Sequence, residues 1–501
     1  MWKKIFLKAF SLSANCLYLR RRLIPDTLTE PMEHKTKRDA ALINLVSDFE
    51  SKIEQGNLGY LEDKSFFRLI EYYEEEYLPE KALEVVDIAL DQFKYRSDFY
   101  VIKAKLLLNF NKYDLCLDYL DKAAAIAPFE TEILLLRARV LALKKEVDEA
   151  LNILSILKDQ MVNDDLIEVL IAESFVYESM KDYDKMYDIL ATAVRIDCKN
   201  SEAMERIWIS AELARRYNDS VQLHLEILDK DPYNYQAWYN LGHGYSCIYE
   251  YEKAVEALEY SFIINDRFEC GYLDCADTCL QIGNFKKALE IYLEANSKFG
   301  PNGELMVCIA NCYLKLDQVA LSKQWLLKSI KLDSYNDEAY FLLGESYARE
   351  SIWYNAINAY HKAIDLDNRR EEYYLGLALA YMSVEDYNKA TINFQMATQT
   401  GPEDTRAWFE YARFLIRLGL VEEASAVLEE ADDYTYGAEL VYCKAAIHYL
   451  NKEKPVCLEL LEEALMEEYQ KHSVLFEIVP EIKLDKDVNG MIRYFKDFED
   501  E

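Results

Sequence analysis

The stretch of sequence that decides the fold is residues 235–261, which read YQAWYNLGHGYSCIYEYEKAVEALEYS. In its first half, Trp238, Leu241 and Tyr245 are three or four residues apart, so they lie on one face of a helix. In its second half, Ala254 is followed four residues later by a leucine, which is the same spacing on a second helix. A pair of short helices cannot bury such faces alone, so the stretch predicts one unit of a repeated array.

The same residue types recur along the chain with a nearly constant period. The repeats start near residues 63, 97, 131, 167, 201, 235, 269, 303, 337, 371 and 405. Successive starts differ by 34 residues except once, where the difference is 36 in the loop around residues 159–165. A degenerate twelfth repeat follows, with Ala445 and Leu461 in the packing positions. A period in this range is typical of a solenoid.

Composition indicates that nearly all of this chain is helical. Of its 501 residues, 51% are hydrophobic, which is enough for a continuous core and excludes general disorder. Glycine and proline, the two helix breakers, number only 14 and 9. The fold class predicted from composition and period together is therefore all-α.

The repeats resemble those of the tetratricopeptide repeat (TPR) family, and in particular long TPR arrays of the bacterial type. The likeness rests on an aromatic residue, a Leu–Gly or Leu–Ala pair and a Tyr, then alternating small and large residues and a closing Pro, as in Trp238, Leu241, Gly242 and Tyr245. It covers residues 63–470 and implies a right-handed α-solenoid, or superhelix, of about twelve helix-turn-helix repeats. We expect a capping helix within residues 39–62 and two further helices within residues 471–501, with an acidic C-terminal end. Solenoids need such polar-backed caps.

The first 38 residues differ from the rest of the chain. They carry nine Lys or Arg and three Asp or Glu, and an uncharged run of eleven residues over 9–19 is too short to span a bilayer. No small-residue cleavage site follows this run, which argues against a secretory signal. A basic segment resting on a membrane surface is one alternative. We interpret residues 1–38 as a basic tail outside the fold that is disordered or not native, with Met32 as the start of the native chain.

Charge excludes one class of ligand. The chain has a net charge of −33, and beyond residue 38 it holds 48 basic and 87 acidic residues, a balance of −39. Such a surface repels phosphate backbones, so we expect no nucleic-acid partner. It favours protein partners with basic or amphipathic segments, although many acidic faces are simply solvated.

The eleven cysteines are typical of a reduced, cytoplasmic protein, because their number is odd and most occupy apolar positions of expected helices. Cys275, Cys279, Cys308 and Cys312 form two pairs with a spacing of four residues, and four thiolates could bind zinc or an iron–sulfur cluster. Because Cys275 and Cys279 take the place of packing residues, we favour buried thiols. We therefore expect no metal and no cofactor.

The family resemblance implies that partners bind in a concave groove lined by the first helices. The expected groove residues lie beside the packing stripe, in an apolar row and a neighbouring, mostly polar row: Phe67, Val101, Lys105, Leu135, Arg139, Ile171, Tyr239, His243, Leu273, Asp277, Val307, Asn311, Phe341, Glu345, Leu375, Leu379, Phe409 and Arg413. The alternative is that the apolar row only packs against the adjacent first helix. The lysine–asparagine–arginine clamp with which some TPR proteins hold chaperone tails is not assembled here.

Nothing in the sequence supports catalysis. None of the six histidines has a metal-type partner four residues away, and no glycine-rich phosphate loop occurs. We therefore predict a non-catalytic, cytoplasmic interaction scaffold with no stable membrane insertion. The alternative is a self-associating structural subunit of a larger complex, which includes the possibility of a homodimer.

Overall fold

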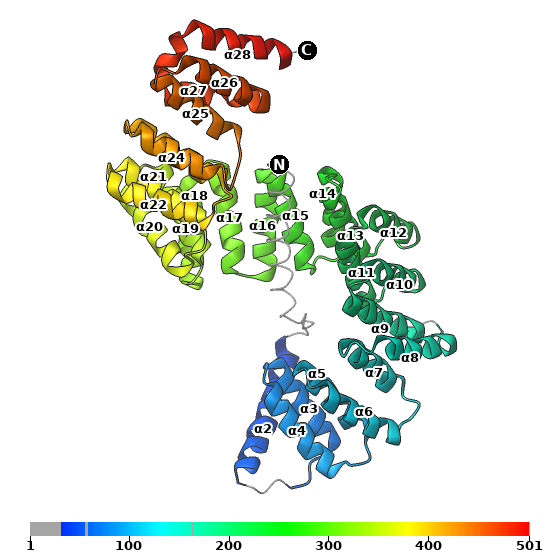
Figure 1. The fold of residues 1–501 in the computed structure, drawn as a ribbon. Coiled ribbons are helices and arrows are strands. Elements are labelled where there is room, and N and C mark those ends of the chain that lie inside the picture. The colour runs from blue at the N-terminus through cyan, green and yellow to red at the C-terminus, as the bar shows by residue number, and fades with distance from the viewer. Residues whose placement is uncertain (1–31, 56–58, 163, 500–501) are drawn as a thin grey trace. The chain divides into compact units, whose positions relative to one another are not determined.

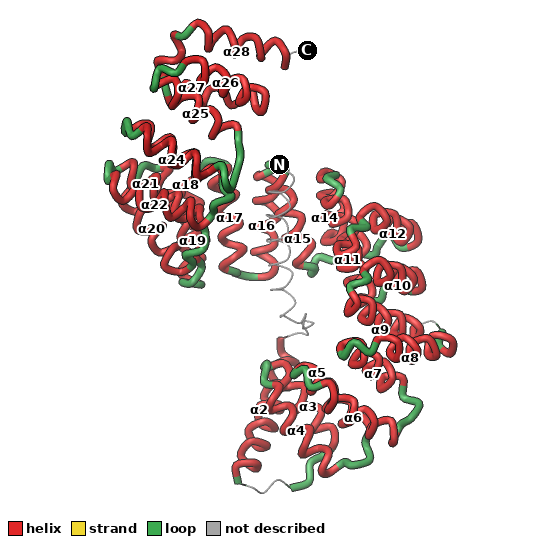
Figure 2. Tube along the Cα trace, viewed as in Figure 1, coloured by secondary structure: helices red, strands yellow, loops and turns green. Residues whose placement is uncertain are grey.

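The computed structural model describes residues 32–55, 59–162 and 164–499, and all regular structure in these ranges is helical (Figures 1 and 2). The chain divides into two compact units, which we call unit 1 (Met1–Arg216) and unit 2 (Tyr217–Glu501). Each unit is an α-solenoid in which every helix packs against its neighbours along the chain. The predicted all-α solenoid is thus confirmed.

The described part of unit 1 begins with a long helix, and the shorter helices after it alternate between first and second helices of the repeats. These helices are α2 (Met32–Glu54), α3 (Asp63–Glu75), α4 (Pro79–Gln92), α5 (Ser97–Asn109), α6 (Tyr113–Ile126), α7 (Thr131–Leu143), α8 (Val147–Gln160), α9 (Asp164–Met180), α10 (Tyr183–Ile196) and α11 (Ser201–Ala214). The odd-numbered helices from α3 onward are the first helices of their repeats.

Unit 2 continues the alternation and ends in shorter elements. Its helices are α12 (Tyr217–Lys230), α13 (Tyr235–Cys247), α14 (Tyr251–Ile264), α15 (Glu269–Gln281), α16 (Phe285–Phe299), α17 (Gly303–Lys315), α18 (Val319–Leu332), α19 (Asp337–Arg349), α20 (Trp353–Leu366), α21 (Glu371–Ser383), α22 (Tyr387–Thr400), α23 (Thr405–Arg417), α24 (Val421–Ala431), α25 (Ala438–Leu450), α26 (Lys454–Glu468), α27 (Ser473–Ile478) and α28 (Lys486–Glu499). Two 3₁₀ helices, η1 (Tyr469–His472) and η2 (Pro480–Leu484), flank α27.

The first helices begin at the predicted repeat starts with one exception. Helix α9 begins at Asp164, three residues before the predicted start at 167, and runs for 17 residues. This is the repeat with the longer period. The two additional residues therefore lengthen the first helix, because nothing in the sequence Asp-Asp-Leu-Ile breaks it.

The N-terminal helix is longer than expected. Helix α2 begins at Met32, so residues 32–38, which we assigned to the tail, belong to this helix. The segment contains Glu, Lys and Arg, which favour helix. The rest of the predicted tail, residues 1–31, lies outside the described residues.

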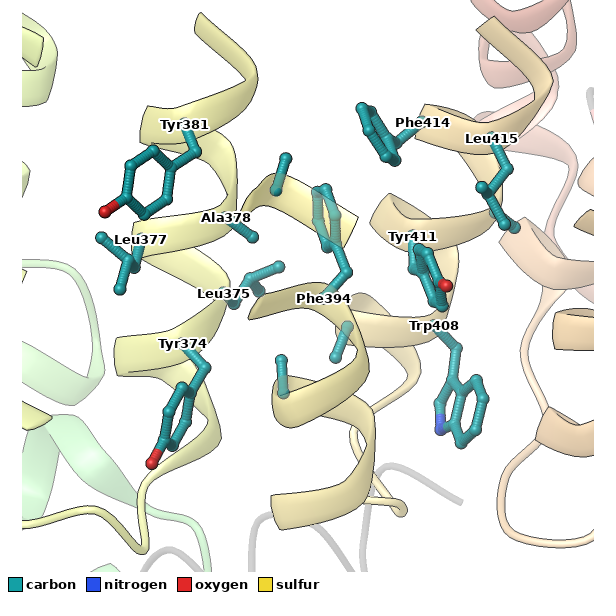
Figure 3. Packing of buried hydrophobic residues seen from close by; sticks show 14 of the residues in the cluster. Tyr374, Leu375, Leu377, Ala378, Tyr381, Phe394, Trp408, Tyr411, Phe414 and Leu415 are labelled. Atoms are coloured by element: carbon teal, nitrogen blue, oxygen red, sulfur yellow. The ribbon is translucent and has the colours of Figure 1, made fainter. Parts of the chain in front are cut away.

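Within each unit the core consists of clusters of buried residues in which small side chains let large ones approach. In unit 2, Phe394 of α22 lies between α21 and α23, with Tyr411 stacked on it at 5.6 Å between ring centroids (Figure 3). Ala378 and Ala412, both fully buried, belong to the same core cluster, where such small side chains leave room for large ones. Gly242 has the same role earlier, since a Cβ there would lie 2.6 Å from the Leu258 side chain. Stability therefore comes from contacts between neighbouring repeats.

Every turn from first to second helix in a repeat contains one residue with a left-handed backbone at the fifteenth position counted from the repeat start. Only Gly283 and Gly419 are glycines there, whereas Lys145 has a φ of 68° and Asn111 a φ of 57°. The turn closes α7 with a bond from the Glu146 amide to the Leu141 carbonyl, at 2.9 Å. A side chain with a Cβ is strained in this conformation, although asparagine tolerates it better than lysine does.

We expect Lys145→Gly to stabilise unit 1 by about 0.5–1 kcal/mol, since relief of this strain exceeds the extra backbone entropy of glycine in the unfolded chain. The measurement is the midpoint of urea unfolding, followed by circular dichroism. Asn111→Gly is the matched control and is expected to change the midpoint little. Equal shifts in the two variants would contradict the explanation.

None of the helices in the described part of the chain combines the length and the apolar character that a bilayer-spanning segment requires.

Candidate functional site

The apolar row of the predicted groove lies on the first helices and is less accessible than its composition suggests. Its members Val101, Ile171, Val307 and Leu375 are buried. The others are partly exposed: Phe67, Leu135, Tyr239, Leu273, Phe341 and Phe409. Packing between adjacent first helices, the alternative raised above, therefore accounts for the four buried members.

The partly exposed rings of this row also rest on the next repeat. Phe67 stacks on Phe99 with 4.8 Å between ring centroids, and Phe341 lies against Tyr373 at 4.9 Å. One face of each ring is thus covered and the other contributes to the surface. The apolar row is the floor of the candidate surface, and the polar row beside it carries the groups that a partner would meet first.

In unit 1 the side chains of the polar row form ion pairs and cation–π contacts with neighbouring residues. Lys105 forms an ion pair of 2.5 Å with Glu132 of the next first helix. Phe175 lies between two guanidinium groups, Arg139 at 4.3 Å and the buried Arg206 at 3.5 Å from the ring centroid. Such cation–π contacts hold the side chains in place. This part of the surface is therefore mixed in charge and internally paired.

In unit 2 two carboxylates of the polar row are held by buried tyrosines. The hydroxyl of Tyr360 donates a hydrogen bond of 2.6 Å to Glu345, and that of Tyr292 donates to Asp277. In both pairs the tyrosine follows the acid by 15 residues, so the contact joins the second helix to the first helix of the same repeat. Burial raises the pKa of both tyrosines, which therefore remain donors.

Sequence reasoning missed these pairs, although a signal was present. The second-helix position of Tyr292 and Tyr360 is occupied by leucine in most other repeats, as at Leu258 and Leu326. A tyrosine that replaces leucine at a core position needs a partner for its hydroxyl. The acidic residue 15 positions earlier supplies that partner.

A second row of acidic residues, also missed, lies one helical turn before the apolar row. It consists of Glu304, Glu338 and Glu372, each the second residue of its first helix. The Glu338 side chain is exposed to solvent, yet its pKa is raised, first by the protein that surrounds the carboxylate and further by Asp337 and Glu304. The carboxylate is therefore partly desolvated by its neighbours although the side chain reaches solvent.

Arg370 and His243 lie beside acidic residues of the first helices. Arg370 is 3.6 Å from Glu372 and 3.8 Å from Asp337, so it belongs to the edge of the acidic row. His243 is 3.1 Å from Asp274, which also accepts a hydrogen bond from Tyr239. The predicted groove residues Tyr239 and His243 are thus joined through an acid of the next repeat.

The chain itself covers the last part of this face. Helix α27 packs on α25 and also touches α23, both of which are first helices. Ile478 and Phe409 both pack against the same core cluster, and Glu477 lies 3.9 Å from Arg413. The predicted groove residues Phe409 and Arg413 therefore lie beside a segment of the same chain.

The cysteine cluster offers no arrangement for a metal. Cys275, Cys279 and Cys312 are fully buried without forming disulfides, and burial raises the pKa of the Cys312 thiol to about 12. Among the described residues, no three or more His, Cys, Asp or Glu side chains are placed to hold a metal ion. A protonated, buried thiol packs as a small apolar group.

Known proteins with similar sequences contain the same kind of repeat. A family model described as tetratricopeptide repeat matches residues 375–438. TPR repeat-containing protein YpiA of Bacillus subtilis is 22% identical over 355 residues, which cover 70% of this chain and 83% of YpiA. TPR repeat-containing protein MJ1428 of Methanocaldococcus jannaschii is 21% identical over 78% of this chain and 79% of its own length. The solved structure of yeast Tom70 covers 84% of this chain and 99% of its own at 14% identity, with a TM-score of 0.36.

Proposed function

We propose, from the premise that this chain is a tetratricopeptide repeat protein, that it is a non-catalytic cytoplasmic scaffold which binds segments of partner proteins on its first helices. The observation that carries the proposal is the surface of unit 2, where half-buried apolar side chains alternate with carboxylates held in place from below. An apolar floor beside ordered polar groups is the arrangement expected of a surface that recognises peptides or helices.

The charge of this surface supports basic or amphipathic segments as partners. Opposite charges accelerate encounter and orient the partner, while the apolar floor supplies most of the affinity. The proposed surface comprises the partly exposed members of the two predicted rows. The four buried members shape it from below.

The test is quantitative affinity capture from native cell extract with two matched variants. Asn311→Arg together with Leu379→Arg places two long cations on the proposed surface, at positions that are partly exposed. Asn358→Arg together with Leu327→Arg makes the same two changes at exposed positions of second helices. Circular dichroism checks that both variants keep the helicity of the wild type.

We expect the first variant to lose the specific partners of the wild type by about tenfold or more, and the second variant to retain them, since roughly 1.4 kcal/mol of lost contact suffices. An unchanged set of partners would reject the first-helix face as the binding surface. Light scattering on the same samples shows whether the species lost is a second copy of this chain, which would favour the self-associating scaffold instead.

A further inference from the structure

We propose that Asn302, in the loop between α16 and α17, is a site of spontaneous covalent modification. Its side-chain amide is lost through attack by the backbone nitrogen of Gly303, which leaves aspartate or isoaspartate in the chain. The reaction needs only water and mild base. It is independent of partner binding and therefore goes beyond the proposed function.

The chain contains two Asn–Gly pairs, Asn302–Gly303 and Asn489–Gly490. An asparagine side-chain carbonyl lies within reach of the next backbone nitrogen, and the side chain of the next residue normally hinders the attack. Glycine has no side chain and leaves the backbone free to turn. Both pairs are therefore candidates from the sequence, and their surroundings in the structure separate them.

Asn302 is exposed and caps the N-terminus of α17. Its Oδ1 accepts a hydrogen bond of 2.9 Å from the Glu304 amide. A bond to the second residue along the chain folds the side chain over the peptide nitrogen between them, which is that of Gly303. Gly303 is the first residue of α17, so its N–H has no carbonyl partner within the helix. The attacking nitrogen is thus not engaged by the helix that it begins.

The N-terminus of α17 favours the charges that develop during the attack. The nitrogen of Gly303 attacks as its anion, and the negative charge then moves to Oδ1 of Asn302 in the tetrahedral intermediate. The positive end of a helix dipole stabilises negative charge at both atoms. The Glu304 amide already donates to Oδ1 and remains in place as the oxyanion forms. The cap therefore assists the reaction electrostatically.

Ring closure requires movement of exposed atoms only. The Met306 amide donates to the Asn302 carbonyl at 3.0 Å, and the Ser329 hydroxyl donates to the Gly303 carbonyl at 2.8 Å. These two bonds hold the attacking nitrogen in place. The Asn302 side chain has to turn onto it, and this motion displaces the loop residues 300–301 and no helix.

The reaction is balanced without an oxidant or a second substrate. A bond forms between the Gly303 nitrogen and Cγ of Asn302, and the bond from Cγ to Nδ2 breaks. The leaving nitrogen takes up the proton of the Gly303 amide and departs as ammonia. Water then opens the five-membered ring at one of its two carbonyls, which gives aspartate or isoaspartate.

The two products differ in their effect on α17. Aspartate keeps an acceptor for the Glu304 amide and adds a negative charge at the helix N-terminus, so the cap is retained. Isoaspartate carries the main chain through its side-chain carbon, which lengthens the chain by one atom and displaces the acceptor. The first turn of α17 then loses its cap. This turn leads directly to Val307, which shapes the proposed surface from below.

The second Asn–Gly pair is protected by α28. The Nδ2 of Asn489 donates to the carbonyls of Lys483 and Asp485 at 2.8 and 2.7 Å. Gly490 is the fifth residue of α28, where the backbone N–H donates to the carbonyl four residues earlier. Attack at Asn489 would have to break these bonds, so this pair is expected to react only when the helix unfolds.

The test follows the folded full-length chain over time in mildly alkaline buffer. Samples are digested at acidic pH, and mass spectrometry detects the replacement of NH₂ by OH in each peptide. An isoaspartate-specific methyltransferase with a labelled methyl donor measures the isoaspartate. We expect Asn302 to react at least about tenfold faster than Asn489. In urea, where both pairs are unfolded, the two rates are expected to agree within about threefold.

Two glycine variants identify the attacking nitrogen. A Cβ at Gly303 would lie 3.5 Å from the Cβ of Asp333, an ordinary contact, so alanine fits the fold there. We expect Gly303→Ala to slow the reaction at Asn302 by about tenfold or more, because its methyl group crowds the nitrogen. Gly490→Ala is the matched control, since a Cβ there has no neighbour within 4 Å, and it is expected to leave the rate at Asn302 unchanged. Circular dichroism checks that both variants remain folded.

Three results would overturn the proposal. The first is that Asn302 stays intact in the folded chain while the unfolded chain reacts, which would mean that the cap protects it. The second is an equal rate at Asn302 and Asn489 in the folded chain. The third is an unchanged rate in Gly303→Ala with no isoaspartate formed, because direct hydrolysis by water gives aspartate alone.

Discussion

Tyr360→Ala is expected to destabilise unit 2 by about 3–5 kcal/mol, because it empties the site of a large buried ring between two repeats. The ring is 1% exposed and lies between Gly344 and Gly376, where a Cβ would come within 2.6 and 2.8 Å of it respectively. The cavity would therefore lie where α19, α20 and α21 meet. Tyr360→Phe keeps the ring, loses only the bond to Glu345, and is expected to cost about 1 kcal/mol.

The contact between Gly344 and the Tyr360 ring predicts that a second substitution, Gly344→Ala, destabilises the wild type but stabilises the Tyr360→Ala variant. In the wild type, Gly344→Ala drives a methyl group into the Tyr360 ring and is expected to cost about 1–3 kcal/mol. In the Tyr360→Ala background the methyl group has room. Alanine is there expected to stabilise the helix by about 0.5–1 kcal/mol relative to glycine. Urea unfolding of the four proteins gives the double-mutant cycle. Additive effects would show that the glycine is not there to admit the ring.

The stability of unit 2 is expected to fall by about 2 kcal/mol between pH 7.5 and 5.0 through His224 alone. This side chain is completely buried on α12, and burial lowers its pKa from 6.5 to about 4. Its Nδ1 lies 2.7 Å from the Ser220 carbonyl and its Nε2 lies 3.1 Å from the Asn240 amide nitrogen. The neutral tautomer that satisfies both has the proton on Nδ1.

The direction of this change in stability depends on whether the folded or the unfolded chain binds the proton more readily. Below pH 6.5 the histidine of the unfolded chain is protonated while that of the folded chain is still neutral, so acid favours unfolding. The contribution of the neutral His224 to the free energy of unfolding is complete above pH 6.5. It is lost progressively down to about pH 4, at about 1.4 kcal/mol per unit of pH.

The measurement compares the wild type with His224→Leu at the two pH values, both above the isoelectric point of about 4.7. Leucine occupies this position in several other repeats, so it fits the site. The carboxylates titrate in both proteins and cancel in the comparison. An equal loss of stability in the two proteins would contradict a neutral, buried histidine.

The positions of the helices could be predicted from sequence because the packing residues determine them. A small residue such as Gly242 or Ala254 is needed wherever two helices approach closely, and its recurrence fixes the start of each repeat. The start of α9 was wrong by three residues, because the period cannot say where two additional residues are placed. The beginning of α2 was missed because residues 32–38 lie outside the predicted repeats, so the period does not constrain them.

The candidate surface was less predictable, because accessibility depends on how closely adjacent first helices approach. Val307 and Phe341 occupy equivalent positions of consecutive repeats, yet the first is buried and the second partly exposed. The sizes of the side chain and of its neighbours determine how accessible it is. The repeat period carries no information about these sizes. The fold of α27 onto α23 has no signal in the period either, since it lies beyond the last repeat.

The constant repeat length gives the separation of Asp277 and Glu345 a particular property. Removing residues 303–336 deletes one whole helix pair and joins Asn302 to Asp337, so that the asparagine which caps α17 takes the place of the one which caps α19. The remaining repeats stay in phase, and the two carboxylates move to neighbouring first helices, about 10 Å apart instead of about 20 Å. The helix pair is thus the unit by which this array can be shortened, and deleting one repeat changes the spacing of the groups on either side of it without substituting any of them.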